Sequence, residues 1–273
     1  MSRYFRTYFP FAKSKILELF QYRMNVVLWF IAEGLFMFVY FFLWKAIYET
    51  PGNPVMIKGF TMEDMLIYIL LAHIIGFLTF DNISYQIGFD IKEGKIANYL
   101  IKPISYRVTL LFISLGTFLG YLMVLLIPNL IVLFTMNKFY NLGFTVKLSD
   151  IAIAFALLIL AKVTQFMFKV FIGLFSFKLT EIHGLIWLMD SLTHFLTGSL
   201  IPIALFPDLL KQITIYLPFA GLIYTPAMIV LGKLPVEALY SAFIIQFIWL
   251  IIFTIAVELL WNRMIKRLVI LGG

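Results

Sequence analysis

Two apolar stretches of the chain carry polar and ionisable side chains at helical spacing. In one, Lys162, Gln165 and Lys169 are three and four residues apart, so on a helix they share one face. In the other, Asp190 and His194 are four residues apart. Charged groups inside a membrane-spanning helix are costly and usually face other helices or a water-filled path. The chemistry open to them is charge pairing, proton or ion coupling, or contact with a transported molecule.

Antiparallel packing of the two stretches predicts which of these side chains meet. At a rise of about 1.5 Å per residue, Lys169 reaches the depth of Asp190, and Lys162 lies near His194. We therefore expect a Lys169–Asp190 ion pair, which either holds the helices together or contacts substrate. Glu33 and His73 lie in other apolar stretches. Each could make an inter-helix polar contact or take part in a translocation pathway.

Motifs for catalysis are missing from the sequence. The histidines His73, His183 and His194 do not have HExxH spacing, and there is no GxSxG motif. Without cysteine there is no thiol nucleophile or thiolate metal site. The nearest approach to a phosphate-binding loop, Gly88 to Lys95, has one residue too many between its glycines. We expect no catalytic, cofactor or metal site here, so any ATP that drives the protein must be hydrolysed by another chain.

The elements that position these side chains are long apolar segments. The 273 residues are 63% hydrophobic and 13% charged, and the mean hydropathy is +1.00. A soluble domain of this size could not bury so much apolar surface. We expect an all-α integral membrane fold with six transmembrane helices, each near the ~20 residues that cross a bilayer. The predicted spans are 26–44, 65–80, 108–136, 151–177, 183–205 and 238–261.

Two further segments are not predicted to be full spans, although we expect residues 1–273 to form a single transmembrane domain. Residues 1–22 mix basic and aromatic side chains around Pro10, which we expect to act as a break, and they predict an N-terminal interfacial elbow helix. Residues 206–233 are apolar but interrupted by prolines, glycines and charges. They predict external re-entrant half-helices before the last span.

Residues 89–102 form a charged segment between the second and third spans. Its lysines place it in the cytoplasm by the positive-inside rule. A short helix over 89–100, ended by Pro103, would present Ile91, Ile96 and Leu100 as apolar anchors for a cytoplasmic partner. The charged residues expected around these anchors are Asp90, Lys92, Glu93 and Lys95.

The distribution of charge predicts the orientation of the chain. The net charge is +7. Twelve basic residues lie in segments that one alternating topology places inside: five before the first span, four at 92–107 and three at 263–267. Five lie in the segments expected outside. This pattern predicts a multi-pass protein with both termini in the cytoplasm and an attraction to anionic membrane lipid, with no nucleic acid as partner.

The order of these segments resembles the membrane subunits of ABC-2-type (type V) ABC exporters over nearly the whole chain. The most specific match is 90–103, Asp-Ile-Lys-Glu-Gly-Lys-Ile-Ala-Asn-Tyr-Leu-Ile-Lys-Pro, which is similar to the acidic, Gly, Leu-x-Lys/Arg-Pro segment of that family. The residues around Pro218 and Pro226 resemble its external re-entrant segment. In such exporters the first of these segments is a coupling helix seated in a cleft of the ATPase.

The resemblance implies a permease subunit of an ATP-driven exporter in the cytoplasmic membrane. It would pair with a second permease, identical or related, and with separate ABC ATPase subunits that bind ATP and Mg²⁺. The substrate would be amphipathic: a drug, an antimicrobial peptide or a lipid-like molecule. Two other functions stay open. One is an ion- or proton-coupled secondary transporter that uses Glu33, His73, Lys169 or Asp190, and the other is a non-transporting membrane scaffold.

Overall fold

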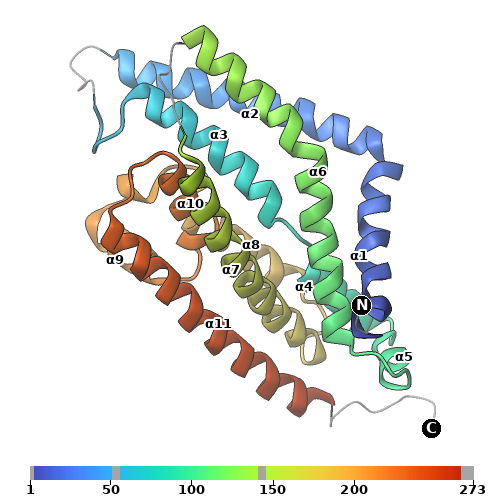
Figure 1. The fold of residues 1–273 in the computed structure, drawn as a ribbon. Helices are drawn as coiled ribbons and strands as arrows, with labels where there is room; N and C mark the ends of the chain where they lie inside the picture. The colour runs from blue at the N-terminus through green and yellow to red at the C-terminus, as the bar shows by residue number, and fades with distance from the viewer. Residues whose placement is uncertain (1–2, 51–55, 141–145, 266–273) are drawn as a thin grey trace.

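The computed structural model describes residues 3–50, 56–140 and 146–265, and these fold almost entirely into helices (Figure 1). Short 3-10 turns at 174–177, 203–205 and 220–222 connect some of them. The helices are α1 (Arg3–Gln21), α2 (Arg23–Glu49), α3 (Met62–Thr79), α4 (Ile83–Lys92), α5 (Ile96–Leu100), α6 (Tyr106–Tyr140), α7 (Leu148–Gly173), α8 (His183–Leu196), α9 (Asp208–Tyr216), α10 (Tyr224–Val230) and α11 (Val236–Ile265).

Four stretches within the described ranges are long and apolar enough to cross a membrane. They coincide with the predicted second, third, fourth and sixth spans. The predicted first span lies within α2, where several side chains fall outside the described part. The chain is therefore a multi-pass, all-α membrane protein. The four stretches are Met62–Lys92, Tyr106–Leu125, Leu148–Phe177 and Val236–Ile265.

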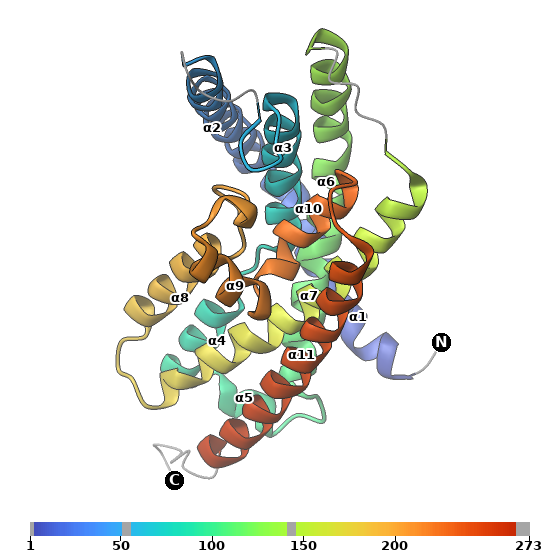
Figure 2. The same ribbon diagram turned by 90° about the vertical axis from the view of Figure 1, so that its left-hand side faces the viewer.

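The predicted fifth span, 183–205, is wrong in its length. Helix α8 ends at Leu196, and its 14 residues rise only about 21 Å, less than the ~30 Å hydrocarbon core. The chain turns at Gly198, whose φ of +77° ends the helix in a conformation that glycine adopts readily. Helix α8 lies beside α7, and α11, which also packs against α7, crosses in front of it in the view of Figure 2.

The segment 206–233 contains two short helices, as expected from its prolines and glycines. These are α9 and α10, and the side chains of α10 from Tyr224 to Ile229 are buried. Because α10 packs against α3 and α7, its interrupted backbone is covered by protein, the condition under which such backbone is tolerated at membrane depth. That the two helices enter the membrane from its outer face stays a prediction.

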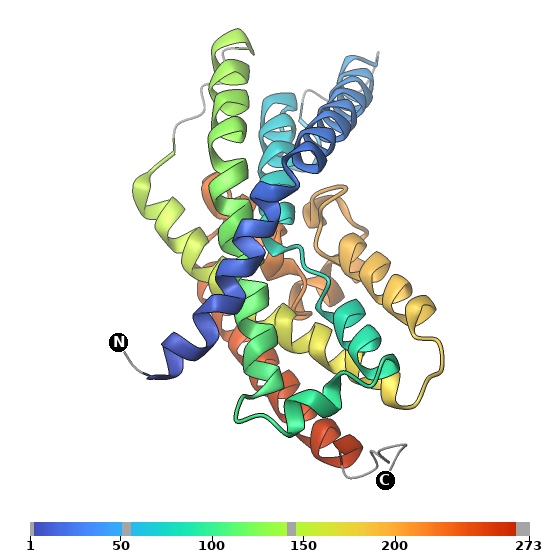
Figure 3. The same cartoon turned by 90° about the vertical axis from the view of Figure 1, so that its right-hand side faces the viewer.

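Helix α1 packs along α6 (Figure 3). The contact is close at Gly116, where an added Cβ would lie 2.4 Å from the carbonyl oxygen of Ala12. Four residues on, Gly120 leaves room for the side chain of Leu19. Pro10 does not break α1, contrary to the prediction. It is exposed, so the carbonyl that loses its intrahelical donor can be reached by solvent or lipid head groups.

Replacing Gly116 by alanine should push α1 away from α6, because the new methyl group would meet backbone atoms that cannot rotate aside. We expect Gly116→Ala to lower the free energy of unfolding by about 1–3 kcal/mol, measured by thermal unfolding in detergent. Gly34→Ala is the matched control, since no atom lies within 4 Å of its added Cβ. Equal melting temperatures for the two variants would contradict the close packing of α1 on α6.

Candidate functional site

Helices α3 and α4 belong to one apolar stretch that is interrupted at residues 80–82. An interruption leaves carbonyl oxygens at the end of α3 without intrahelical donors, and inside a membrane protein other groups must satisfy them. The interruption also contains a carboxylate, that of Asp81, whose side chain is 2% exposed. Asp81 was not among the predicted polar residues, because it falls at the edge of a predicted span rather than within it.

Two lysines of α7 supply the missing donors. The Lys162 ammonium donates to the carbonyl oxygen of Thr79 at 2.8 Å and to Oδ2 of Asp81 at 2.8 Å. The Lys169 ammonium donates to the carbonyl oxygen of Asp81 at 2.7 Å. Both lysines are buried, so the helix break and the lysines satisfy each other's charge and hydrogen bonds.

Hydroxyl groups connect this cluster to further helices. The Ser114 hydroxyl of α6 donates to Oδ2 of Asp81 at 2.8 Å. The Ser84 hydroxyl of α4 donates to the carbonyl oxygen of Lys169 at 2.8 Å. Asp81 also accepts from the backbone N–H of Ile83, the first residue of α4. One buried carboxylate thus joins α3, α4, α6 and α7.

The predicted Lys169–Asp190 ion pair is present, with Lys169 Nζ 3.6 Å from Asp190 Oδ1. Lys162, which we expected near His194, donates instead to the break between α3 and α4, which lies against α7. The hydroxyl oxygen of Ser199 lies 3.1 Å from Nδ1 of His194.

A cavity of about 530 Å³ lies among α2, α3, α7 and α8 and brings most of the predicted polar residues together. The side chain of Glu33 lies outside the described part. Lys162 does not line the cavity, and its ammonium is bound at the helix break. No group of three or more His, Asp or Glu side chains in the described ranges could hold a metal ion. The predicted residues that line the cavity are His73, Gln165, Lys169, Asp190 and His194, beside Phe36, Tyr40, Phe77 and Phe80.

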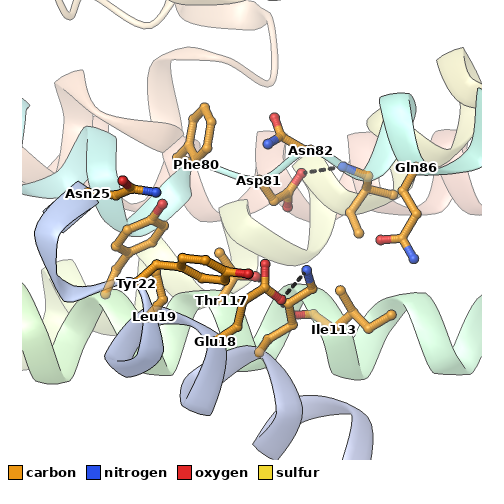
Figure 4. A pocket seen from close by; sticks show the side chains of 13 residues that line it. Glu18, Leu19, Tyr22, Asn25, Phe80, Asp81, Asn82, Gln86, Ile113 and Thr117 are labelled. Carbon is orange, nitrogen blue, oxygen red and sulfur yellow. Dashed lines mark hydrogen bonds and ion pairs between the residues drawn. The ribbon is translucent and has the colours of Figure 1, made fainter. Parts of the chain in front are cut away.

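A second cavity, of about 230 Å³, lies on the other side of the helix break, between α1, α4 and α6. Figure 4 shows Glu18 of α1, and Tyr22 between α1 and α2, across the cavity from Asp81 and Gln86. Phe80 lines both cavities. The break is therefore a partition that both cavities share.

The predicted docking segment is not one helix. Helix α4 ends at Lys92, and Gly94 turns the chain with a φ of +68° before α5 begins. This turn carries Ile96 into the interior, where it is 1% exposed and packs in the same cluster as Tyr106. Ile96 is therefore unavailable as an anchor for a partner, contrary to the prediction.

The other predicted docking residues divide between the interior and the surface. Asp90 is buried and accepts a hydrogen bond from the Tyr106 hydroxyl at 2.9 Å, so it holds the segment to α6 instead of facing a partner. Ile91 packs partly buried beside it, and the side chain of Leu100 lies outside the described part. The exposed predicted residues are Lys92, Glu93 and Lys95.

Two large apolar side chains that the prediction missed stand beside these charges. Phe89 is 54% exposed and Ile101 is 80% exposed, and the Lys95 ammonium lies 4.1 Å from the centre of the Phe89 ring. Lys92 forms an ion pair of 2.7 Å with Glu181 of the turn before α8. The hydrogen bond from Lys92 holds the pKa of Glu181 below its ordinary value.

Removing the Asp81 carboxylate should destabilise the protein far more than removing that of Asp190. Asp81→Asn leaves Lys162 buried without a carboxylate partner, and breaking such a pair costs about 3–5 kcal/mol. Asp190→Asn changes a side chain that is 38% exposed, for which we expect about 1 kcal/mol or less. Denaturant unfolding in detergent would measure both. Similar values for the two variants would show that Asp81 does not hold the helix break.

Comparison with protein families identifies the chain. The model of the ABC-2 family transporter proteins matches residues 35–272, which include the helix break, the α4–α5 segment and every residue that lines the larger cavity except Ala32. A search among curated proteins finds no match. Since the family match covers most of the 273 residues, the chain belongs to the ABC-2 transporter family and is a membrane-embedded permease component of an ABC transporter.

Proposed function

We propose that this chain is the permease subunit of an ATP-driven exporter in the cytoplasmic membrane. A separate ABC ATPase subunit binds ATP and Mg²⁺ and hydrolyses the nucleotide, while the permease conducts an amphipathic drug, antimicrobial peptide or lipid-like molecule outward. Family membership supports the ATPase partner. The observation that carries the proposal is a continuous set of contacts from the exposed α4–α5 surface to the cavity, through Asp81 and Lys169.

The docking surface for the ATPase, in this proposal, is the exposed side of residues 89–101. Phe89 and Ile101 are its apolar anchors, in place of the buried Ile96. Lys92, Glu93 and Lys95 surround them as a charged rim. Large exposed apolar side chains with polar neighbours are typical of a protein interface.

The arrangement of the chain supports a cytoplasmic position for this surface. The start of α1, helix α5 and the end of α11 lie at the same end of the molecule (Figure 1). The same end has the basic residues of α1, of the 92–107 segment and of the last turn of α11. By the positive-inside rule this end faces the cytoplasm.

Movement of the ATPase would reach the cavity through the helix break. Helix α4 begins at Ile83, whose backbone N–H donates a hydrogen bond to the Asp81 carboxylate. A shift of α4 therefore moves Asp81, and Asp81 holds Lys169, which in turn pairs with Asp190 on α8. A second permease subunit would supply the opposite wall of the path. The cost of separating buried charges makes such a linkage stiff.

Charge placed on the apolar anchors should abolish ATPase binding. We expect Phe89→Asp and Ile101→Asp each to reduce co-purification of the ATPase subunit at least tenfold, because each puts a carboxylate into the apolar centre of the interface. Co-purification from membranes with a tagged permease measures this. The control is Leu209→Asp on α9, a residue that is also largely exposed. Normal ATPase recovery with both docking variants would refute the assignment.

Filling the cavity should stop transport and leave ATPase binding intact. Gly76 lines the cavity, and its added Cβ meets only an ordinary contact, Ile223 Cδ1 at 3.6 Å. We expect Gly76→Phe to reduce ATP-dependent efflux of an amphipathic dye from proteoliposomes at least tenfold. Gly184→Phe, with no atom within 4 Å of its Cβ, is the control. Efflux that persists in Gly76→Phe, or that requires no ATP, would contradict the proposed path or the proposed energy source.

A further inference from the structure

The wall of the α2–α3–α7–α8 cavity exposes negative charge more than positive charge. The side chain of Asp190 is 38% exposed, whereas that of Lys169 is 9% exposed. The ion pair between them spans 3.6 Å, longer than an ordinary charge-assisted hydrogen bond. The Asp190 carboxylate is therefore only partly neutralised and is the more accessible of the two charges.

The ammonium of Lys169 makes its shortest contact with Asp81. Its ammonium donates to the Asp81 carbonyl oxygen at 2.7 Å and lies 3.7 Å from Oδ1 of the same residue. A cation that bound Asp190 would remove one of the longer contacts of Lys169 and leave the shortest intact. An anion at Lys169 would have to compete with a fully buried carboxylate group that also holds Lys162.

We propose that this cavity binds the protonated amine of an amphipathic molecule, with the Asp190 carboxylate as its counter-ion. The inference rests on the proposed function, because it names the class of molecule that the exporter would carry. The amine lies at the α7–α8 wall. The apolar body lies against the aromatic side chains of α2 and α3.

The other side chains of the cavity wall also favour a cation that can donate hydrogen bonds. Gln165 is more than nine-tenths buried, and its Oε1 has no hydrogen-bond partner in the described part of the chain. An ammonium brings up to three N–H donors, whereas an anionic head group brings further acceptors. The aromatic side chains of Phe36, Tyr40 and Phe77 supply an apolar wall for the rest of the molecule. Its volume of about 530 Å³ is in the range of small-molecule sites.

Binding of two probes of equal chain length tests the charge preference. The full chain is reconstituted in phosphatidylcholine nanodiscs, and empty nanodiscs supply the background partitioning. Radiolabelled dodecylamine, protonated at pH 7, is compared with radiolabelled dodecanoate. We expect saturable binding of dodecylamine above background and at least tenfold weaker binding of dodecanoate.

Three variants then locate the site. Asp190→Asn should weaken dodecylamine binding about tenfold, equivalent to about 1.4 kcal/mol. Lys169→Met should tighten it, because Asp190 then loses its internal partner, an effect that a purely structural role would not produce. Asp208→Asn removes an exposed carboxylate from the first turn of α9 and should change nothing. If Lys169→Met does not fold, Asp190→Asn remains decisive.

Equal binding of dodecanoate, or unchanged dodecylamine binding by Asp190→Asn, would overturn the inference. Neither result would touch the proposed function, which fails separately if no ATPase co-purifies with the chain. Conversely, amine binding with the expected response to the variants would support the site even in a chain isolated from its ATPase.

Discussion

A buried carboxylate between two lysines is stable only where every charge is paired and every remaining hydrogen-bond donor and acceptor is used. Asp81 meets this condition because it lies in a helix break. The carbonyl oxygens of the break accept hydrogen bonds from Lys162 and Lys169. These bonds replace the ones that the backbone N–H groups of a continuous helix would have supplied. The charges and the interruption therefore depend on each other. Helices α3, α4, α6 and α7 meet at this point.

The helix break lies between two cavities and contributes Phe80 to the lining of both. The larger cavity contains the predicted polar side chains of α3, α7 and α8, and the smaller one lies under α1. Between the smaller cavity and the exposed α4–α5 surface runs only the ten-residue helix α4. A subunit that pushed on this surface, as we propose for the ATPase, would act on Asp81 through this one short helix.

The predicted docking segment, residues 89–102, differs from its prediction in which side chains are buried. Its charges predicted a surface segment, and Lys92, Glu93 and Lys95 are exposed. The helical pattern assigned Ile96 to the surface as well, because a continuous helix was assumed. The left-handed turn at Gly94 reverses the facing of the residues that follow it, so Ile96 packs inside. Glycine permits such a turn but does not require it, and no periodicity could have revealed it.

By itself the sequence determined the class of the protein, most of its spans and five of the polar residues that line the larger cavity. Apolar length and charge placement depend on chain composition alone, and the spacing of Lys169 and Asp190 on their helices was enough to predict their contact. Tertiary structure alone decided the partner of Lys162, the length of α8 and the inward position of Ile96. These depend on where backbone hydrogen bonds are interrupted, and an interruption is fixed by the packing of helices that are distant in sequence.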